Sequence, residues 1–306
     1  MTTVLLFERT IIAHCVINLG QPSTLWHGRA GLAIPVSAFI ITKNEELRLP
    51  RTLAALQPWV DEIVVVDSGS TDRTVELAGL MGATIFHREW SGYGGQKHFA
   101  EQQCRNEWVL NVDADEVITP DLSLEICALF ADDAIPKPGA FCVRILTVYP
   151  GDAKPRRFAD DYNEVRFYHR SIGTYRDHPV FDRVLVKGTV PRQLQQPIFH
   201  FPYTSFAHLI TKINEFSSFR SRSSNARRPS ILVARLFIEF PTTFIKHYFF
   251  RLHITGGWKG FYFALCTAFM RTTRIAKMLE TQFLPPAEQL PRSEVVGKSV
   301  ETQVTM

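Results

Sequence analysis

The sequence predicts an α/β fold with a mainly parallel sheet and helices on both of its faces. Short apolar runs of strand type alternate with helical segments, and the links between them are short. Polar residues directly follow three of the expected strands, at the edge where open α/β sheets place their ligands. A chain of 306 residues is long enough for about two domains.

The first expected elements come from simple patterns of apolar residues. Residues 36–42 form a buried-strand run, and Leu47, Leu53 and Leu56 are spaced to share one helix face that ends at Pro58. Alternation of the same two kinds of segment continues toward the middle of the chain. In order we expect strand 36–42, helix 47–56, strand 63–66, a capped helix reaching Leu80, strand 83–87 and a helix from Lys97 to about Cys104.

A glycine-rich segment, residues 90–97, follows the third strand. Three glycines beside two aromatic residues favour a mobile loop that approaches a ligand closely, although an ordinary flexible connector has the same composition. Lys97 is expected to open the next helix. Its ammonium group and the helix amino terminus would then both face an anion.

The run from Trp108 to Glu116 combines an apolar strand with a group of acidic residues. An apolar strand ends abruptly in Asp113, Asp115 and Glu116. Acidic groups at the end of a buried strand are costly unless a positive charge meets them. A divalent cation would meet them, since hard cations take carboxylate oxygens and share them with substrate phosphates. An acidic turn without a metal is the alternative.

The rest of the chain divides into a second group of strands and a helical end. After a helix at 121–131 and a linker at 132–139, strands are expected at 140–149, 165–169 and 184–187, and helices at 205–219, 231–251 and 260–270. Glycines at 256–260 are expected to break the helical end. The expected divisions are an amino-terminal extension, 1–34, a catalytic domain, 35–204, an amphipathic helical region, 205–283, and a disordered tail, 284–306.

The charge of the chain is concentrated at its helical end. Residues 205–280 carry 12 Lys and Arg against 3 Asp and Glu, whereas the whole chain has a net charge of only +4. Such a basic, aromatic-rich segment suggests an anionic membrane surface as partner, with no nucleic acid required. No apolar run reaches the roughly 18 residues that span a bilayer. The five scattered cysteines favour a reducing compartment, and thus a cytoplasmic, peripheral protein.

Three strand ends are expected to point into one crevice. They bring residues 42–45, 67–72 and 113–116 together, a set suited to a ribose or base and to a metal-bound diphosphate. The chain has no Gly-x-Gly-x-x-Gly after the first strand and no Gly-Lys-Ser/Thr, so dinucleotide-binding and P-loop folds are disfavoured.

Four motifs in this order resemble the family 2 glycosyltransferases of GT-A fold. They are Ile40 to Glu45, Glu62 to Asp72, Gln96-Lys97 and Asp113-Ala114-Asp115-Glu116. More narrowly, the chain is similar to the bacterial lipopolysaccharide core glucosyltransferase group, the WaaE/KdtX-like proteins, from about Pro35 to Glu280. The resemblance implies a nucleotide-sugar donor, such as a UDP-sugar, a divalent metal (Mg²⁺ or Mn²⁺), and an inverting displacement.

The resemblance also implies roles for single residues. The donor would be bound by Thr42, Asn44, Glu45, Asp67, Ser70, Asp72, Gln96, Lys97 and Asp113. Asp113 and Asp115 would hold the metal, with Asp115 the more direct ligand. The acceptor would be a lipid-linked or lipopolysaccharide glycan, met at the inner face of the cytoplasmic membrane.

Asp182 matches the position of the general base in related proteins. It lies in Pro179-Val180-Phe181-Asp182-Arg183, where relatives carry a Pro-Val-His-Glu/Asp-Arg stretch. An inverting transfer needs such a base for the acceptor hydroxyl. Phe181 departs from the histidine of the relatives, and residues 151–161 replace their tryptophan-rich loop. A salt bridge of Asp182 with Arg183 or Arg166 is the structural alternative.

Two other functions compete with glycosyl transfer. A sugar nucleotidyltransferase also combines a nucleotide fold with metal-binding acids, but it usually carries a Gly-rich basic loop where this chain has Lys43-Asn44-Glu45-Glu46. A non-catalytic glycan-binding protein with a degenerate transferase fold is the other possibility. The presence of Asp113, Asp115 and Asp182 argues against it.

Overall fold

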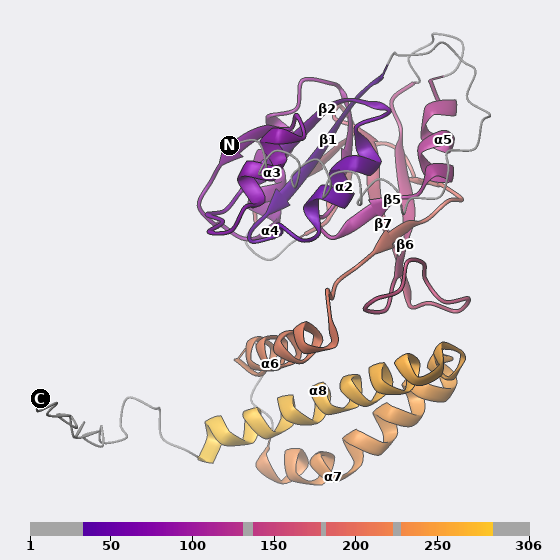
Figure 1. Ribbon diagram of the computed structural model, residues 1–306. Coiled ribbons are helices and arrows are strands. Elements are labelled where there is room, and N and C mark those ends of the chain that lie inside the picture. Colours follow the sequence, from indigo (N-terminus) through magenta and orange to yellow (C-terminus); the bar gives the residue numbers. More distant parts are fainter. Residues whose placement is uncertain (1–32, 131–136, 179–181, 223–227, 284–306) are drawn as a thin grey trace, which may run out of the picture. The chain divides into compact units, whose positions relative to one another are not determined.

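The computed structural model describes residues 33–130, 137–178, 182–222 and 228–283 (Figure 1). The expected extension before residue 33, the expected tail after residue 283 and Phe181 lie outside these ranges. Contacts within the chain divide it into two compact units, unit 1 up to Phe206 and unit 2 from Ala207.

Unit 1 is built on a nine-stranded sheet of order β3-β2-β1-β4-β7-β6-β11-β5, with β10 beside β6. A separate hairpin pairs β8 with β9. The strands are β1 (Ile34–Thr42), β2 (Val60–Asp67), β3 (Thr84–His87), β4 (Trp108–Asn111), β5 (Glu116–Ile118), β6 (Ala140–Thr147), β7 (Asp161–His169), β8 (Gly173–Tyr175), β9 (Val184–Val186), β10 (Arg192–Gln193) and β11 (Ile198–His200).

The sheet is parallel over β3, β2, β1 and β4, as expected, and becomes mixed beyond them. β7 runs antiparallel to both β4 and β6, and β11 runs antiparallel to β5. The short strands β5, β8, β10 and β11 are not expected from the sequence, because two or three residues carry no recognisable period.

Helices cover both faces of the sheet, which confirms the predicted fold class. The helices of unit 1 are α2 (Leu49–Leu56), α3 (Thr74–Leu80), α4 (Tyr93–Gln102) and α5 (Pro120–Ala128). α2, α3 and α5 pack with the β1 side chains Val36, Ala38 and Ile40 in one apolar cluster. Phe39, on the opposite face of β1, packs with Ala100 of α4. Alternate residues of one strand thus serve two cores.

α4 begins four residues before the expected position, which corrects two predictions. The helix starts at Tyr93, so Gly94 and Gly95 lie in its first turn and are buried, and Lys97 lies one turn inside it. The segment was expected to lie close to a ligand, but the groups that lie close to its glycine Gly95 are protein side chains. A Cβ atom on Gly95 would lie 2.8 Å from Ser91 Oγ and 2.9 Å from Asp177 Oδ1.

Unit 2 consists of α6 (Phe206–Arg222), α7 (Pro229–Ile245) and α8 (Gly257–Phe283). A π-helical segment (Lys246–Phe250) and a 3₁₀ turn (His253–Gly256) join α7 to α8. The break therefore precedes Gly257, and residues 257–260 begin α8, where the sequence suggested a break. No helix in the described ranges is long and apolar enough to cross a membrane.

Two cations of α8, Arg271 and Lys277, make contacts inside unit 2. Arg271 Nε donates to Glu239 Oε1 of α7 at 2.7 Å. Lys277 Nζ donates to the side chains of Asn214, Ser217 and Ser218 of α6 at 2.7–2.8 Å. These two cations therefore link the three helices, and they are not simply an exposed face for an anionic surface.

Candidate active site

The carboxyl ends of β1, β2 and β4 meet at one edge of the sheet. Thr42 at the end of β1 lies opposite Asp67 at the end of β2, and Asn111 at the end of β4 pairs with Phe39 of β1. The parallel order of these strands is what brings the three predicted polar segments together.

The loops after β1 and β2 are held to one another by hydrogen bonds. The amide of Asn44 donates to Ser70 Oγ at 2.8 Å, and the amide of Thr71 donates back to Asn44 Oδ1 at 2.8 Å. The amide of Glu46 donates to Asp72 Oδ2 at 3.2 Å. Asn44 adopts a left-handed conformation with φ of 56°, which asparagine tolerates better than most residues. The loops form one rigid wall.

The Asp67 carboxylate accepts three hydrogen bonds from its own turn. Its Oδ2 accepts from the amides of Gly69 and Ser70, both at 2.9 Å, and its Oδ1 accepts from the Ser70 hydroxyl. Gln96, fully buried on α4, donates to Ser68 Oγ at 2.7 Å and so braces the same turn. The contacts of Asp67, Ser70 and Gln96 are thus structural ones.

Lys97 links the two groups of catalytic candidates. Its buried Nζ lies 2.9 Å from Asp113 Oδ1 and 3.0 Å from Asp182 Oδ1. Burial acts to lower the pKa of this lysine, but the charge of Asp113, with Tyr175 and Asp182, outweighs it and the pKa is raised. Asp182 is therefore paired with Lys97, whereas the sequence suggested Arg183 or Arg166 as the alternative partner.

Arg166 forms hydrogen bonds with two carboxylates of the acidic motif. It is fully buried on β7, and its Nη2 donates at 2.8 Å to both Asp113 Oδ2 and Glu116 Oε1. Its Nη1 donates to Asn111 Oδ1, which also accepts from the Tyr175 hydroxyl at 2.8 Å. Arg166 is buried because β7 is an interior strand between β4 and β6.

The two acids on Arg166 have opposite pKa shifts. Burial acts to raise the pKa of Asp113, but the charges of Arg166 and Lys97 outweigh it and hold the pKa well below its usual range. Burial raises the pKa of Glu116 to about 7; the charge of Arg166 acts to lower it, but burial and the nearby charge of Asp113 outweigh that effect. Asp113 is thus the carboxylate that stays ionised across the physiological range.

Asp115 lies among a different set of cations. Its Oδ2 accepts from Arg48 Nη1 at 3.1 Å and lies 3.4 Å from His200 Nε2. Arg48 also donates to Glu45, and this fixes the loop after β1 to the acidic motif. Burial acts to lower the pKa of His200, but the hydrogen bond and charge of Asp115, with Glu116 and Asp113, outweigh it and raise the pKa.

The donor set fits a divalent cation that is completed by a substrate. Asp113 and Asp115 are partly exposed, at 30% and 21%, and the contacts of the Asp115 carboxylate with Arg48 and His200 both use Oδ2. Mg²⁺ is commonly held by one or two carboxylates together with substrate phosphates. Among the described residues no cluster of three His, Cys, Asp or Glu side chains is arranged to hold a metal alone. The protein part of such a site is these two carboxylates.

Three residues of this site escape sequence reasoning: Arg48, Arg166 and His200. Arg48 follows the Lys-Asn-Glu-Glu run directly, and its position is the one available signal. Arg166 and His200 reach the motif only through the pairing of β7 with β4 and of β11 with β5. No spacing in the sequence reports these pairings.

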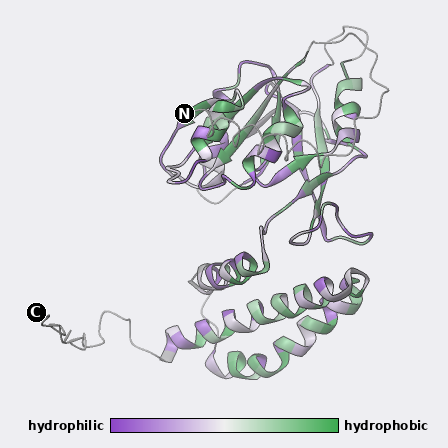
Figure 2. Ribbon diagram, viewed as in Figure 1, coloured by the Kyte–Doolittle hydropathy of each residue, from purple (hydrophilic) through white to green (hydrophobic). Residues whose placement is uncertain are grey.

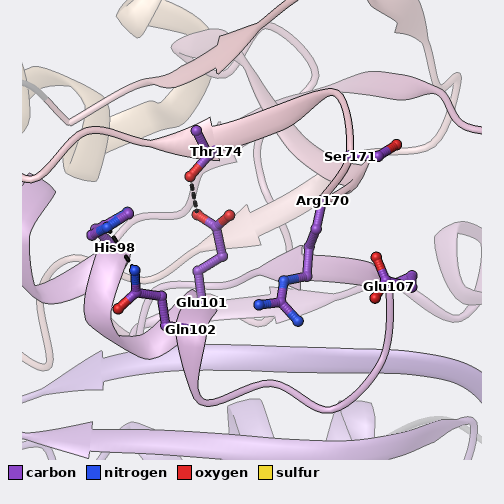
Figure 3. A pocket seen from close by; sticks show the side chains of 7 residues that line it. All are labelled: His98, Glu101, Gln102, Glu107, Arg170, Ser171 and Thr174. Carbon is purple, nitrogen blue, oxygen red and sulfur yellow. Dashed lines mark hydrogen bonds between the residues drawn. The ribbon is translucent and has the colours of Figure 1, made fainter.

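A cavity of about 340 Å³ lies away from this edge of the sheet (Figure 3). Glu107 precedes β4 and Arg170 follows β7, so the cavity lies at the amino end of β4, opposite Asp113. Glu101 of α4 points into it and accepts from Thr174 (Figure 3). The remaining lining residues are His98, Gln102 and Ser171, and none of the predicted site residues is among the seven.

Comparison with known proteins gives three similarities. Residues 37–184 match the family described as Glycosyl transferase family 2. A protein of Rickettsia felis, described as an uncharacterized glycosyltransferase, is 35% identical over 272 residues, which cover 86% of this chain and 96% of the relative. The lipopolysaccharide core biosynthesis glycosyltransferase LpsC of Rhizobium meliloti is 30% identical over 263 residues, which cover 82% and 94%.

Similarity to solved structures is weaker. A crystal structure of glucosyl-3-phosphoglycerate synthase from Mycobacterium tuberculosis, in complex with Mn²⁺, UDP and glucosyl-3-phosphoglycerate, is 23% identical with a TM-score of 0.29. The match covers 41% of this chain and 51% of that one. The two bacterial relatives, in contrast, align over nearly their whole lengths, so that similarity concerns the whole protein.

Proposed function

The chain belongs to the family 2 glycosyltransferases, and from this premise we propose that it moves a hexose from a nucleotide-sugar donor to a cell-envelope glycan. The proposed donor is a UDP-sugar, glucose being the first sugar to test. The proposed acceptor is lipopolysaccharide core, which is supported by the 30% identity with LpsC. The reaction would invert the anomeric centre.

The observation that carries this proposal is the contact of Lys97 with two distant carboxylates. Asp113 and Asp182 lie within 3.0 Å of one ammonium nitrogen, so the motif for the diphosphate and the candidate base are neighbours. A displacement at one carbon needs this proximity, because the leaving group and the attacking hydroxyl flank the same atom. The neighbouring acids thus support a transferase over a binding protein.

The metal is proposed to be Mg²⁺ or Mn²⁺, held by Asp113 and Asp115. When bound, the cation would neutralise charge on the leaving diphosphate. Arg166 and Lys97 keep Asp113 ionised for this role. Arg48 and His200 hold Asp115 at the end of the motif.

The donor is proposed to lie along the rigid wall of the two loops. Thr42, Asn44, Glu45, Asp67, Ser70 and Asp72 would line the nucleoside, and Gln96 and Lys97 would lie on the diphosphate side. Because Asp67, Ser70 and Asp72 already bond within the wall, their proposed contribution is its shape and the direction of its exposed groups.

Asp182 is the proposed general base. It would accept the proton of the acceptor hydroxyl as that oxygen attacks the anomeric carbon from the face opposite the diphosphate. The Asp182 side chain is 36% exposed, so a substrate has access to it, while Lys97 fixes its position. The proton would remain on Asp182 until solvent removes it.

Transfer of label tests the proposal. The protein is incubated with radiolabelled UDP-sugars, Mg²⁺ or Mn²⁺ and truncated lipopolysaccharide, and a thermal-shift screen of donors selects the sugars to use. We expect label in the lipid fraction and none after EDTA. Consumption of a nucleoside triphosphate with a sugar phosphate, and no transfer from any donor, would instead identify a nucleotidyltransferase.

The proposed reaction takes place at the inner face of the cytoplasmic membrane, with the chain as a peripheral protein. A lipid-linked acceptor is held in that surface, and the basic unit 2 is suited to anionic lipid.

A further inference from the structure

The joint between α7 and α8 exposes a compact group of large apolar side chains. We define residues 246–259 as the tip. Five of its side chains are exposed: Phe249, Phe250, Leu252, Ile254 and Trp258. Phe250 is 80% exposed and Trp258 67%. Figure 2 shows that the hydrophobic character extends along α7 and the first half of α8. Five large apolar groups within 14 residues exceed the scattered exposure that is normal for a surface.

The tip has a defined shape, because a second set of aromatic side chains packs behind it. The rings of Phe244, Tyr248 and Phe261 lie 5.4–5.6 Å from one another, between centroids. His253 is fully buried and stacks on Phe263 at 5.4 Å. Gly257, with φ of 58°, lets the chain turn into α8. The outward residues are therefore displayed by a packed support.

The charge around the tip has one sign. Lys246, Arg251 and Lys259 belong to it, and residues 240–279 contain no Asp or Glu. A second copy bound through the same surface would bring these cations together at a cost in free energy. An anionic surface complements them. Cations beside exposed aromatic and aliphatic groups are the arrangement of segments that lie in a lipid headgroup layer.

We propose that the tip is the membrane-binding element of this protein and inserts into the headgroup region of an anionic phospholipid bilayer without crossing it. Trp258, Phe249 and Phe250 would enter the interface, where Trp is favoured and Phe side chains form the apolar face of interfacial segments. Lys246, Arg251 and Lys259 would meet lipid phosphates. This inference rests on the proposed function only for the purpose of binding, which is to reach a lipid-linked acceptor.

The proposed contact does not use Arg271 and Lys277 of α8. Arg271 and Lys277 hold α7 and α6, so reversing their charge would disturb unit 2 itself. A test on those residues cannot separate binding from folding. The tip residues point outward, and replacing them leaves the packed support in place.

Vesicle flotation of the full chain tests the proposal. Vesicles of phosphatidylcholine are compared with vesicles that also contain phosphatidylglycerol. We expect the wild-type chain to float with the anionic vesicles at low salt, and binding to fall as salt rises. The tip variant F250S/W258S should bind these vesicles at least about tenfold more weakly than the wild type. The charge variant K246E/R251E should lose about fivefold per residue on anionic vesicles.

The matched control is L80S/V190S. Leu80 and Val190 are 70% and 84% exposed in unit 1, so two apolar side chains of similar fractional exposure are removed away from the tip. This variant should float like the wild type, and circular dichroism should show all variants folded. Absence of wild-type flotation at low salt, or equal flotation of tip and control variants, would overturn the proposal. So would a wild-type oligomer that F250S/W258S dissociates with no change in vesicle binding.

Failure of this inference is distinguishable from failure of the proposed function. Flotation needs neither donor nor metal, so D115A should float normally even where transfer is lost. Hydrolysis of a nucleotide-sugar without lipid should proceed equally in the wild type and F250S/W258S. If the chain floats with vesicles but transfers no sugar, the membrane-binding proposal stands and only the proposed transferase function is refuted.

Discussion

Two buried cations organise the acidic motif, Lys97 from α4 and Arg166 from β7. Each binds Asp113 through a different oxygen, so that carboxylate has both of its oxygens in ion pairs before any ligand arrives. Asp115, two residues later, uses one oxygen for Arg48 and His200. The motif therefore contains one carboxylate that is held in place and one that is more available, although both are aspartate.

Arg166→Met is expected to be among the most destabilising substitutions in unit 1. Removing one partner of a buried ion pair leaves the other charges uncompensated, a cost of about 3–5 kcal/mol. Asp113 and Glu116 would both lose their shared donor. Guanidinium unfolding measures the effect. Arg105→Met, which breaks an exposed pair with Asp61, is the control and should change little. Equal stability of the two variants would contradict this account.

Asp115→Ala is expected to abolish transfer while the fold persists. Loss of charge stabilisation on the leaving diphosphate should cost at least about 3 kcal/mol, more than a hundredfold in rate. Asp115 is partly exposed and its partner Arg48 keeps the bonds to Glu45, so stability should fall far less than for Arg166→Met. Asp61→Ala, at the amino end of β2, is the control for activity. A fully active D115A enzyme would exclude the metal role.

Asp182→Asn is expected to slow turnover by about 10²–10⁴-fold with unchanged donor affinity. Asparagine keeps the size of the side chain and removes the basic carboxylate. Steady-state rates with calorimetric donor binding separate the two quantities. Asp177→Asn, in the same connection between β8 and β9, should retain both. If D182N kept its rate and lost donor affinity, Asp182 would belong to the donor pocket.

At the scale of elements, the sequence predicts the strands whose periodic residues are locally visible. β1, β2 and β4 are long apolar runs followed by polar residues, so their ends and the acids on them could be located in advance. β7 alternates like a half-exposed strand, and only its insertion between β4 and β6 buries Arg166. The sequence places the start of α4 too late because Gly94 and Gly95 normally disfavour helix, whereas here the missing side chain of Gly95 makes room for Ser91 and Asp177.

Glu101 ties α4 to the β8 strand and makes this link depend on pH. It accepts from the Tyr175 amide at 2.8 Å, and burial raises its pKa above the ordinary 4.5. The folded state then binds this proton more tightly than the unfolded chain. Its contribution to stability is therefore fully present below about pH 4.5 and is lost as pH rises through the folded pKa.

Glu101→Gln removes that dependence. The amide oxygen of glutamine still accepts from Tyr175, but no charge has to be buried. The free energy of unfolding is measured for both proteins from about pH 4 to 8. The value for the variant should therefore increase relative to that of the wild type as pH rises. Glu107→Gln, exposed at the rim of the same cavity, is the control (Figure 3). A difference between wild type and E101Q that is constant with pH would contradict the assignment.

At the scale of the whole molecule, the proposed chemistry and the proposed attachment occupy different units. Every site residue from Thr42 to His200 belongs to unit 1, and the tip belongs to unit 2. The charge follows the same division, with an excess of 9 cations in residues 205–280. Composition alone could indicate this asymmetry. It could not indicate which cations of unit 2 are used in packing its helices.

Ending the chain after Phe206 is expected to separate donor binding from use of a lipid-linked acceptor. Unit 1 keeps Arg48 with its acceptors, the carbonyls of Phe201 and Pro202, and keeps the core clusters around β1. The shortened chain should therefore show the same thermal shift with donor and Mn²⁺ as the full chain. Transfer to lipopolysaccharide in vesicles should fall by about tenfold or more, because surface attachment no longer concentrates enzyme and acceptor. The full chain carrying F250S/W258S is the matched control and should show the same loss. A folded shortened chain without a donor shift would mean that unit 2 contributes to the donor site.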